Sequence, residues 1–186
     1  MRSAGAGWND RIRKRFASSP EGVEVTAMDT KVRQKTLRML SNGVYVLTSR
    51  SDGRYGAATV SWVSQASFKP PLIMAAVRRE SNVFECLAES RCAVLHIVGD
   101  RQQEIARRFF FPTHAASGTI NGEAFMDGKT AAPVLPNLPA HIECQVEQIV
   151  DTHGDHAVVI LRAVEAECQE RVRPLTMAAT PWNYGG

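Results

Sequence analysis

Short β-branched segments separated by turn residues constrain the fold of this chain more than any other feature. Residues 44–49 are apolar and β-branched, the turn signal Ser51-Asp52-Gly53 follows, and residues 55–66 return as a second strand. Alternating or continuous apolar runs predict further strands at residues 72–77, 92–98, 142–147 and 157–164. Hairpins of this kind favour an antiparallel barrel or sandwich.

The predicted helices are few and short. Asp29 or Thr30 can cap a helix at residues 31–40, and Ser81 or Asn82 can cap one that ends at Ser90. Residues 102–110 read as a third, amphipathic helix. The chain has no strand–GxGxxG–helix unit, so a doubly wound nucleotide-binding fold is not expected. Residues 111–139 lack periodicity and predict a functional or disordered loop.

Size and composition are those of one globular domain. The chain has 186 residues, 44% hydrophobic and 22% charged, with a net charge of +3. We expect a flexible arm at residues 1–28 and a folded domain at residues 29–186. The basic run at residues 11–15 has no aromatic pattern beside it, so no nucleic-acid partner is expected.

No membrane or secretory segment is predicted, because no run of about 18 apolar residues and no signal-peptide core occur. The four cysteines are scattered and form no Cys-x-x-Cys pair. We therefore expect a cytoplasmic protein without disulfides.

The return strand of the hairpin is unusually polar. A buried strand is normally rich in Val, Ile and Leu, whereas this segment carries four hydroxyls and an amide before the Pro-Pro stop at residues 70–71. These side chains are Thr59, Ser61, Ser64, Gln65 and Ser67. None of them titrates, so the row suits a flat polar ligand better than a metal ion or a catalytic nucleophile.

The segment that follows the next strand predicts an anion site. Arg78 and Arg79 immediately precede a helix whose first turn carries Ser81 and Asn82. Helix N-termini attract anions, and Arg binds phosphate oxygens in a bidentate fork. The alternative is a solvated strand end followed by an ordinary helix cap.

Other kinds of chemistry find little support. The nucleophile motif Gly-x-Ser-x-Gly is absent, so no catalytic triad is expected. His153 and His156 would point to opposite faces of a hairpin tip, which suits a metal badly. We predict neither a metal site nor an acid–base or nucleophilic catalytic residue.

These residues resemble a known family. The run GAATVSWVSQASFKPP at residues 56–71 resembles the flavin-binding segment of the flavin reductase family, the FMN-binding split barrels. The segment NGVYVLT at residues 42–48, the Ser81-Asn82 pair and GDH at residues 154–156 agree in order, so the resemblance covers residues 36–175. The form SWVSQASFKPP and the terminal WNYGG are most similar to the reductase-like domain of flavodiiron proteins.

The resemblance implies a six-stranded split β-barrel of Greek-key antiparallel type, usually a homodimer with flavin near the interface. The residues that it places at the flavin are Thr59, Ser61, Trp62, Val63, Ser64, Gln65, Ala66, Ser67, Arg78, Ser81 and Asn82. His156 either contacts the nicotinamide or makes a structural hydrogen bond. Trp62 either flanks the ring or belongs to the core, and Phe109-Phe110-Phe111 either pack a helix or border the pocket.

The implied function is an NAD(P)H-dependent flavin oxidoreductase. It would bind FMN, with FAD as the alternative, accept hydride from NADH or NADPH, and release reduced flavin or pass electrons to a monooxygenase or another redox partner. A second hypothesis is an FMN-binding electron-transfer module without nicotinamide chemistry. A third is a split barrel recruited to haem or another cofactor.

Overall fold

The structure, a computed structural model, describes residues 28–184, which divide into two units at residue 40. The first unit holds helix α2 (Thr30–Leu37), whose N-cap Asp29 accepts hydrogen bonds from the N–H groups of Lys31 and Val32. The helix predicted at residues 31–40 is present but ends at Leu37. Residues 1–27 lie outside the described residues, so the boundary predicted at residue 28 stays a prediction.

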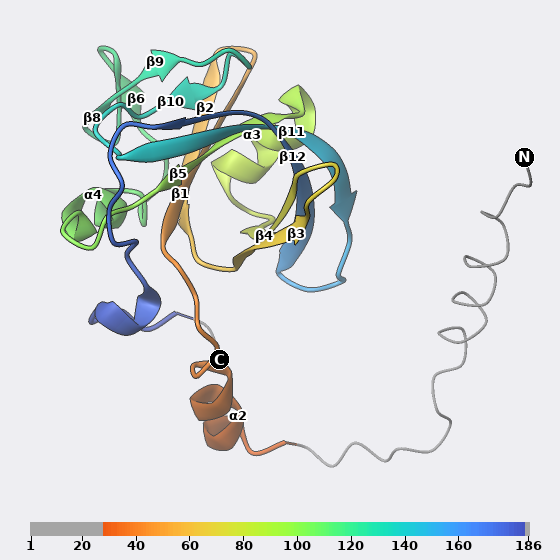
Figure 1. The fold of residues 1–186 in the computed structure, drawn as a ribbon. Helices are drawn as coiled ribbons and strands as arrows, with labels where there is room; N and C mark the ends of the chain where they lie inside the picture. The colour runs from red at the N-terminus through yellow and green to blue at the C-terminus, as the bar shows by residue number, and fades with distance from the viewer. Residues whose placement is uncertain (1–27, 185–186) are drawn as a thin grey trace, which may run out of the picture. The chain divides into compact units, whose positions relative to one another are not determined.

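Seven strands of the described chain form one antiparallel sheet. They are β1 (Tyr45–Ser51), β2 (Arg54–Val60), β3 (Val63–Ser67), β4 (Leu72–Arg78), β5 (Cys92–Ile97), β11 (Ala140–Val150) and β12 (His156–Cys168). Their order across the sheet is β2-β1-β5-β11-β12-β4-β3 (Figure 1). The mainly β, antiparallel prediction is confirmed, and Asp52 and Gly53 make the predicted turn with φ angles of +48° and +76°.

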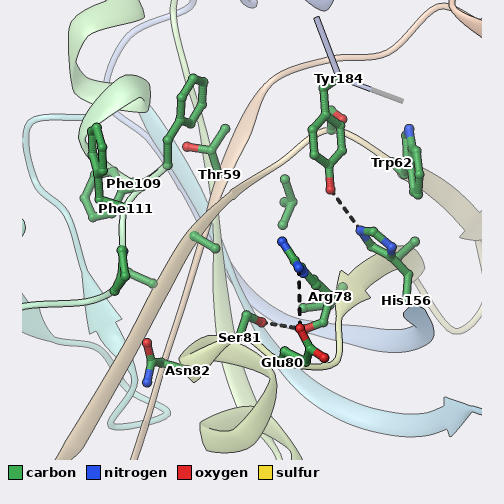
Figure 2. A pocket seen from close by; sticks show the side chains of 18 of the residues that line it. Thr59, Trp62, Arg78, Glu80, Ser81, Asn82, Phe109, Phe111, His156 and Tyr184 are labelled. Carbon is green, nitrogen blue, oxygen red and sulfur yellow. Dashed lines mark hydrogen bonds and ion pairs between the residues drawn. The ribbon is translucent and has the colours of Figure 1, made fainter. Parts of the chain in front are cut away.

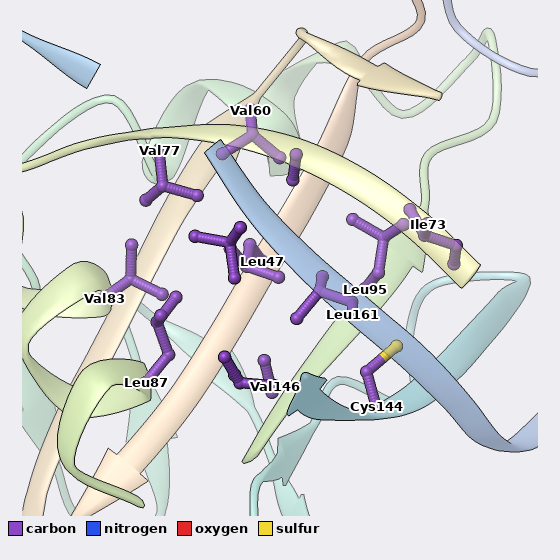
Figure 3. Close-up of a cluster of buried hydrophobic side chains, with 13 residues drawn as sticks. Leu47, Val60, Ile73, Val77, Val83, Leu87, Leu95, Cys144, Val146 and Leu161 are labelled. Atoms are coloured by element: carbon purple, nitrogen blue, oxygen red, sulfur yellow. The ribbon is translucent and has the colours of Figure 1, made fainter. Parts of the chain in front are cut away.

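The sheet curls into a split barrel around one hydrophobic core (Figure 3). Leu47 of β1 and Ile73 of β4 belong to the same buried cluster, although four strand positions separate their strands. In a flat sheet that separation is about 19 Å, so only curling brings the two side chains into one cluster. β2 and β3 are the sheet edges and do not pair with each other, which leaves the barrel open along one seam.

The strand predicted at residues 55–66 is wrong in one respect, because it is two strands. β2 pairs with β1, the chain leaves the ladder at Ser61 and Trp62, and β3 pairs with β4 on the other edge. This break also explains why the sheet has seven strands and not the expected six. Period-2 patterning could not reveal it, because hydroxyl side chains tolerate both an extended strand and a bend.

Helix α3 (Asn82–Ser90) packs against β1 and β2 and adds Val83 and Leu87 to the core. Its N-cap is Ser81, so the helix predicted to end at Ser90 is confirmed. The amphipathic helix predicted at residues 102–110 is the shorter α4 (Gln103–Arg108), and Phe109 directly after it is buried. Phe109 belongs to a second core cluster, on the opposite face of the sheet.

The loop predicted at residues 111–139 is more ordered than its sequence suggests. It contains five two-residue strands, β6 (Ala115–Ala116), β7 (Thr119–Ile120), β8 (Glu123–Ala124), β9 (Met126–Asp127) and β10 (Pro133–Val134). Buried polar side chains hold it to the barrel: Glu143 accepts three hydrogen bonds from Lys129 and Thr130, and Glu123 pairs with Arg108 at 2.6 Å. These contacts join residues 13 to 15 positions apart, a separation that local periodicity does not report.

His96 of β5 is a further anchor of this loop and is fully buried. The Leu135 N–H can only donate, so the ring Nε2 accepts it at 2.9 Å, and the Nδ1–H donates to the Val46 carbonyl at 3.1 Å. Acceptance at Nε2 requires a neutral ring with its proton on Nδ1. Burial, assisted by nearby His141, lowers the pKa of His96 from 6.5 to about 3.

This depressed pKa predicts an acid-dependent loss of stability. The neutral ring contributes fully above pH 6.5, and that contribution is lost as the pH falls toward the folded-state pKa of about 3. By pH 5 the loss in free energy of unfolding is about 2 kcal/mol. Urea denaturation at pH 7 and pH 5 checks this, with His96→Gln expected to remove the pH-dependent component.

The exposed His153→Gln variant is the control and keeps the wild-type pH dependence. The explanation is wrong if His96→Gln loses as much stability between the two pH values as the wild-type protein does.

Candidate functional site

A pocket of about 630 Å³ lies between the ends of β2 and β4, at the open seam of the barrel (Figure 2). Its walls are the ends of β2 and β4, the Ser61-Trp62 link, the start of α3, residues 109–113 and the C-terminal residues 182–184. All of these belong to the unit formed by residues 40–184. The volume is that of an ordinary small-molecule site.

The first wall is formed by residues 109–113, which are hydrogen-bonded to the edge of β2 that pairs with no other strand. The Thr59 N–H donates to the Phe109 carbonyl at 3.1 Å, and the Ala57 N–H donates to Thr113 Oγ1 at 2.9 Å. Thr59 Oγ1 itself donates to the Ala106 carbonyl of α4 at 2.6 Å. The Thr59 hydroxyl therefore holds this wall in place, and only its lone pairs remain for a ligand.

The second wall is the N-terminus of α3. The Ser81 hydroxyl donates to the Arg78 carbonyl at 2.6 Å and accepts the Phe84 N–H at 3.3 Å, which fixes the first turn. Gly56 of β2 lies directly against this turn, since a Cβ there would lie 2.4 Å from the Val83 Cα. Only glycine allows this approach, and it brings the positive end of the helix dipole to the pocket.

Arg78 extends from the end of β4 into the same part of the pocket. Its guanidinium lies 3.4 Å from the Glu80 carboxylate, and both side chains are largely exposed. Arg79, in contrast, donates to the Gly154 carbonyl and pairs with Asp151, and it does not line the pocket. The anion site predicted from two arginines therefore has one arginine and a neighbouring carboxylate.

Ser61 is the most informative residue of the pocket. Its hydroxyl is buried, and it is the one buried side-chain polar atom among the described residues that has no hydrogen-bond partner. A buried unpaired hydroxyl costs about 1–3 kcal/mol of stability. A polar ligand in the pocket would supply the missing partner.

The far end of the pocket is aromatic. The rings of Trp62 and His156 lie 4.7 Å apart between centroids, and Tyr184 lies 5.5 Å from Trp62. His156 Nε2 is hydrogen-bonded to the Tyr184 hydroxyl at 2.9 Å (Figure 2). On the other side of the ring, His156 Nδ1 is hydrogen-bonded to Asp155 at 2.8 Å. The cluster offers flat surfaces beside a hydrogen-bonding edge.

Two groups of the Asp155–His156–Tyr184 hydrogen-bond network have shifted pKa values. The hydrogen bond from His156 holds the pKa of the Asp155 carboxyl below its usual range. Burial, assisted by the Asp155 charge, raises the pKa of the Tyr184 hydroxyl. Asp155 therefore accepts the Nδ1–H of His156, and the Tyr184 hydroxyl shares the second hydrogen bond with Nε2.

The structure brings seven of the predicted site residues together. Those that line the pocket are Thr59, Ser61, Trp62, Arg78, Ser81, Asn82 and His156. The other five, Val63, Ser64, Gln65, Ala66 and Ser67, form β3 and do not line it. In the single chain these five are partly or largely exposed on an edge strand, so their contact with flavin stays a prediction.

Some pocket residues were not predicted as site residues. Glu80, Trp182 and Tyr184 line the pocket, as do Phe110 and Phe111 of the phenylalanine triplet. The tail gave a usable signal, because two aromatic residues in a short polar segment need a surface to pack on. The two alternatives for the triplet are packing of a helix and a place at the pocket border. Phe109 does both, since it packs in the core and also lines the pocket.

Two further findings concern the described part of the chain. No group of three or more His, Cys, Asp or Glu side chains there is placed to hold a metal ion. Within residues 28–184, no helix combines the length and the apolar character needed to cross a membrane.

Known sequences resemble this chain in part. It is 28% identical over 134 residues to an NADH:FMN oxidoreductase of Rhodococcus qingshengii, a match that covers 72% of this chain and 68% of that protein. It is 29% identical over 129 residues to diflavin flavoprotein A 1 of Synechocystis, covering 68% of this chain. The chain spans only 22% of the length of that diflavin protein.

Solved structures share the fold. The flavin reductase of styrene monooxygenase from Pseudomonas putida superposes with a TM-score of 0.67 at 24% identity, covering 79% of this chain and 91% of that one. A flavin reductase domain protein from Arthrobacter gives a TM-score of 0.70 at 21% identity, covering 84% and 99%. These likenesses agree with the split barrel described above.

The family model described as "Flavin reductase like domain" matches residues 37–181 of the 186. The match includes the whole seven-stranded sheet and nearly all of the pocket, apart from the last three lining residues. The chain belongs to the flavin reductase like domain family.

Proposed function

We propose that this protein is an NAD(P)H-dependent flavin oxidoreductase that binds FMN in the pocket at the barrel seam. The observation that carries the proposal is the buried, unpartnered hydroxyl of Ser61, which lines a pocket between a helix N-terminus and an aromatic cluster. A phosphorylated heteroaromatic ring needs those three features: an anion site, hydrogen bonds at the ring edge and a flat apolar surface.

Each end of the pocket has its own task in this proposal. Arg78 and the first turn of α3, which Ser81 caps and Asn82 begins, would bind the phosphate. Ser61 would donate its free hydroxyl to the ring edge, and Thr59 could only accept there because its own proton is committed to Ala106. The donor set therefore suits a ring edge that presents both acceptors and donors.

When bound, FMN supplies an acceptor for the hydride of a reduced nicotinamide. The protein contributes position, because the two rings must lie within about 3–3.5 Å of each other. Among the described residues that line the pocket, His156 and Tyr184 are the polar side chains of the aromatic end, so we assign His156 to the nicotinamide side. No side chain is required as a nucleophile.

FMN in preference to FAD, and NADH or NADPH as donor, belong to the proposal and follow the names of the relatives. One relative is named an NADH:FMN oxidoreductase, whereas a structural neighbour from Streptomyces globisporus is named an NADH:FAD oxidoreductase. Other neighbours are named as flavin reductase components of a styrene monooxygenase and a tryptophan halogenase. We propose that reduced flavin similarly serves a partner enzyme.

We also propose a homodimer. In the described single chain β3 pairs only with β4, so its outer edge and its polar residues are free to meet a second copy. A second copy would give Ser64, Gln65 and Ser67 the contacts near flavin that a single chain does not provide.

Anaerobic reduction tests the activity. Protein loaded with FMN should lose flavin absorbance in the visible range when NADH or NADPH is added. If the protein retains FMN and neither nucleotide bleaches it, the chain is an electron-transfer module. If it takes up no flavin at all, both proposals are wrong.

Arg78→Ala tests the phosphate site. Loss of the guanidinium should weaken FMN binding about tenfold, because a charge-assisted hydrogen bond is lost, and should leave riboflavin binding nearly unchanged. Fluorescence titration with both ligands measures this. Arg162→Ala is the matched control, because Arg162 pairs with Glu147 away from the pocket. Equal losses for FMN and riboflavin would rule out the phosphate contact.

Ser61→Ala separates stability from binding. Removal of a buried unpaired hydroxyl should leave the free energy of unfolding equal or higher, while FMN affinity falls about fivefold to tenfold. Ser49→Ala is the matched control, because the buried Ser49 hydroxyl donates to the Cys92 carbonyl at 2.7 Å. That variant should lose stability and keep its FMN affinity. The same pattern in both variants would contradict the role given to Ser61.

A further inference from the structure

The C-terminal segment, residues 182–184, contacts two walls of the pocket. The Trp182 ring packs edge-on against Phe110, with 4.7 Å between centroids. Tyr184 contacts Trp62 and bonds to His156 from the other side (Figure 2). The segment therefore bridges the wall that follows α4 and the aromatic end of the pocket.

The Trp182 ring anchors the start of this segment against the second core cluster, whereas the backbone of the segment is weakly tied to the barrel. Thr180 and Trp182 are held by short local bonds, from the Thr180 N–H to the Met177 carbonyl at 3.1 Å and from the Trp182 N–H to Thr180 Oγ1 at 3.3 Å. Beyond Trp182, within the described chain, no backbone hydrogen bond joins Asn183 or Tyr184 to the sheet. Segments with so few backbone bonds open at low free-energy cost.

The Tyr184 hydroxyl is consequently the specific attachment of the end of this segment. It is hydrogen-bonded to His156 Nε2 at 2.9 Å, and Asp155 holds the His156 ring in place through Nδ1 at 2.8 Å. The Tyr184 side chain is still 49% exposed, so its ring forms part of the pocket's outer surface. A single hydrogen bond at a half-exposed side chain is readily exchanged for one to an incoming ligand.

Tyr184 also covers the surface that a second ring requires. The ring lies tilted by 48° to Trp62 and bonds to Nε2 of His156, the residue assigned above to the nicotinamide side. A nicotinamide that approaches the flavin from this end meets Tyr184 first. The closed segment and a bound nicotinamide therefore compete for His156.

We propose that residues 182–184 form a gate over the pocket, closed by the Tyr184–His156 hydrogen bond and opened when a nicotinamide ring takes the place of Tyr184. This gate rests on the proposed function and deepens it, because it regulates access of the second substrate. Because only open molecules bind nicotinamide, the apparent Kd equals the intrinsic Kd divided by the fraction of molecules that are open. Removal of the Tyr184–His156 hydrogen bond should raise the apparent affinity about twofold to tenfold.

Tyr184→Phe tests the gate, because it removes the hydroxyl and keeps the ring. In FMN-loaded protein, we expect NAD⁺ to bind two- to tenfold more tightly in the variant, by titration of the flavin absorbance. The rate of FMN reduction at subsaturating NADH should rise by a similar factor, while the Kd for FMN stays unchanged. In flavin-free protein, hydrogen exchange of the Trp182 N–H, which donates to Thr180 Oγ1, should become faster.

Tyr55→Phe is the control, since Tyr55 packs on Phe125 outside the pocket and should change none of these quantities. Equal NAD⁺ affinity and equal reduction rates in the wild-type and Tyr184→Phe proteins overturn the gate alone. Weaker NAD⁺ binding in the variant also overturns it and makes Tyr184 a binding residue. If both proteins hold FMN but neither binds NAD⁺ nor is reduced, the proposed function fails, and the gate fails with it.

Discussion

The change of strand partner at Ser61 and Trp62 is the constraint on which the rest of the structure depends. β2 ends its ladder with β1 at Val60, and β3 begins a new ladder with β4 at Val63. The Trp62 carbonyl accepts the Ala76 N–H at 2.9 Å. The chain therefore crosses the seam here, while β2 and β3 remain unpaired with each other. The pocket occupies this seam, and a ladder continued through Ser61 would close it.

Hydroxyl side chains around the seam divide into two groups. Thr59 and Ser81 donate to backbone carbonyls and thereby hold the walls, whereas Ser61 has no partner and is left for a ligand. Residue type cannot separate the two groups, because Ser and Thr serve equally well as caps, wall contacts and ligand donors. The sequence therefore placed polar residues along the whole segment, and in the single chain only those before β3 line the pocket.

Local signals predicted much of the fold. The Asp52-Gly53 turn, the Ser81 cap and the alternation in β11 follow from short-range physics and appear where expected. The order of residues 111–139 did not, because it depends on buried side chains of the barrel strands, such as His96 and Glu143, that lie outside the segment. Similarly, the two arginines at residues 78 and 79 look alike in sequence, yet the strand end directs them to different partners.

By itself the sequence determined the antiparallel class, the turns and caps, and a motif specific enough to indicate the family. These features depend on residues within a few positions of one another. Only the tertiary structure decided which edge of the barrel stays open, which hydroxyl lacks a partner, and that Tyr184 reaches His156. The reason is physical: a pocket forms from segments more than a hundred residues apart, and their meeting depends on how the sheet curls.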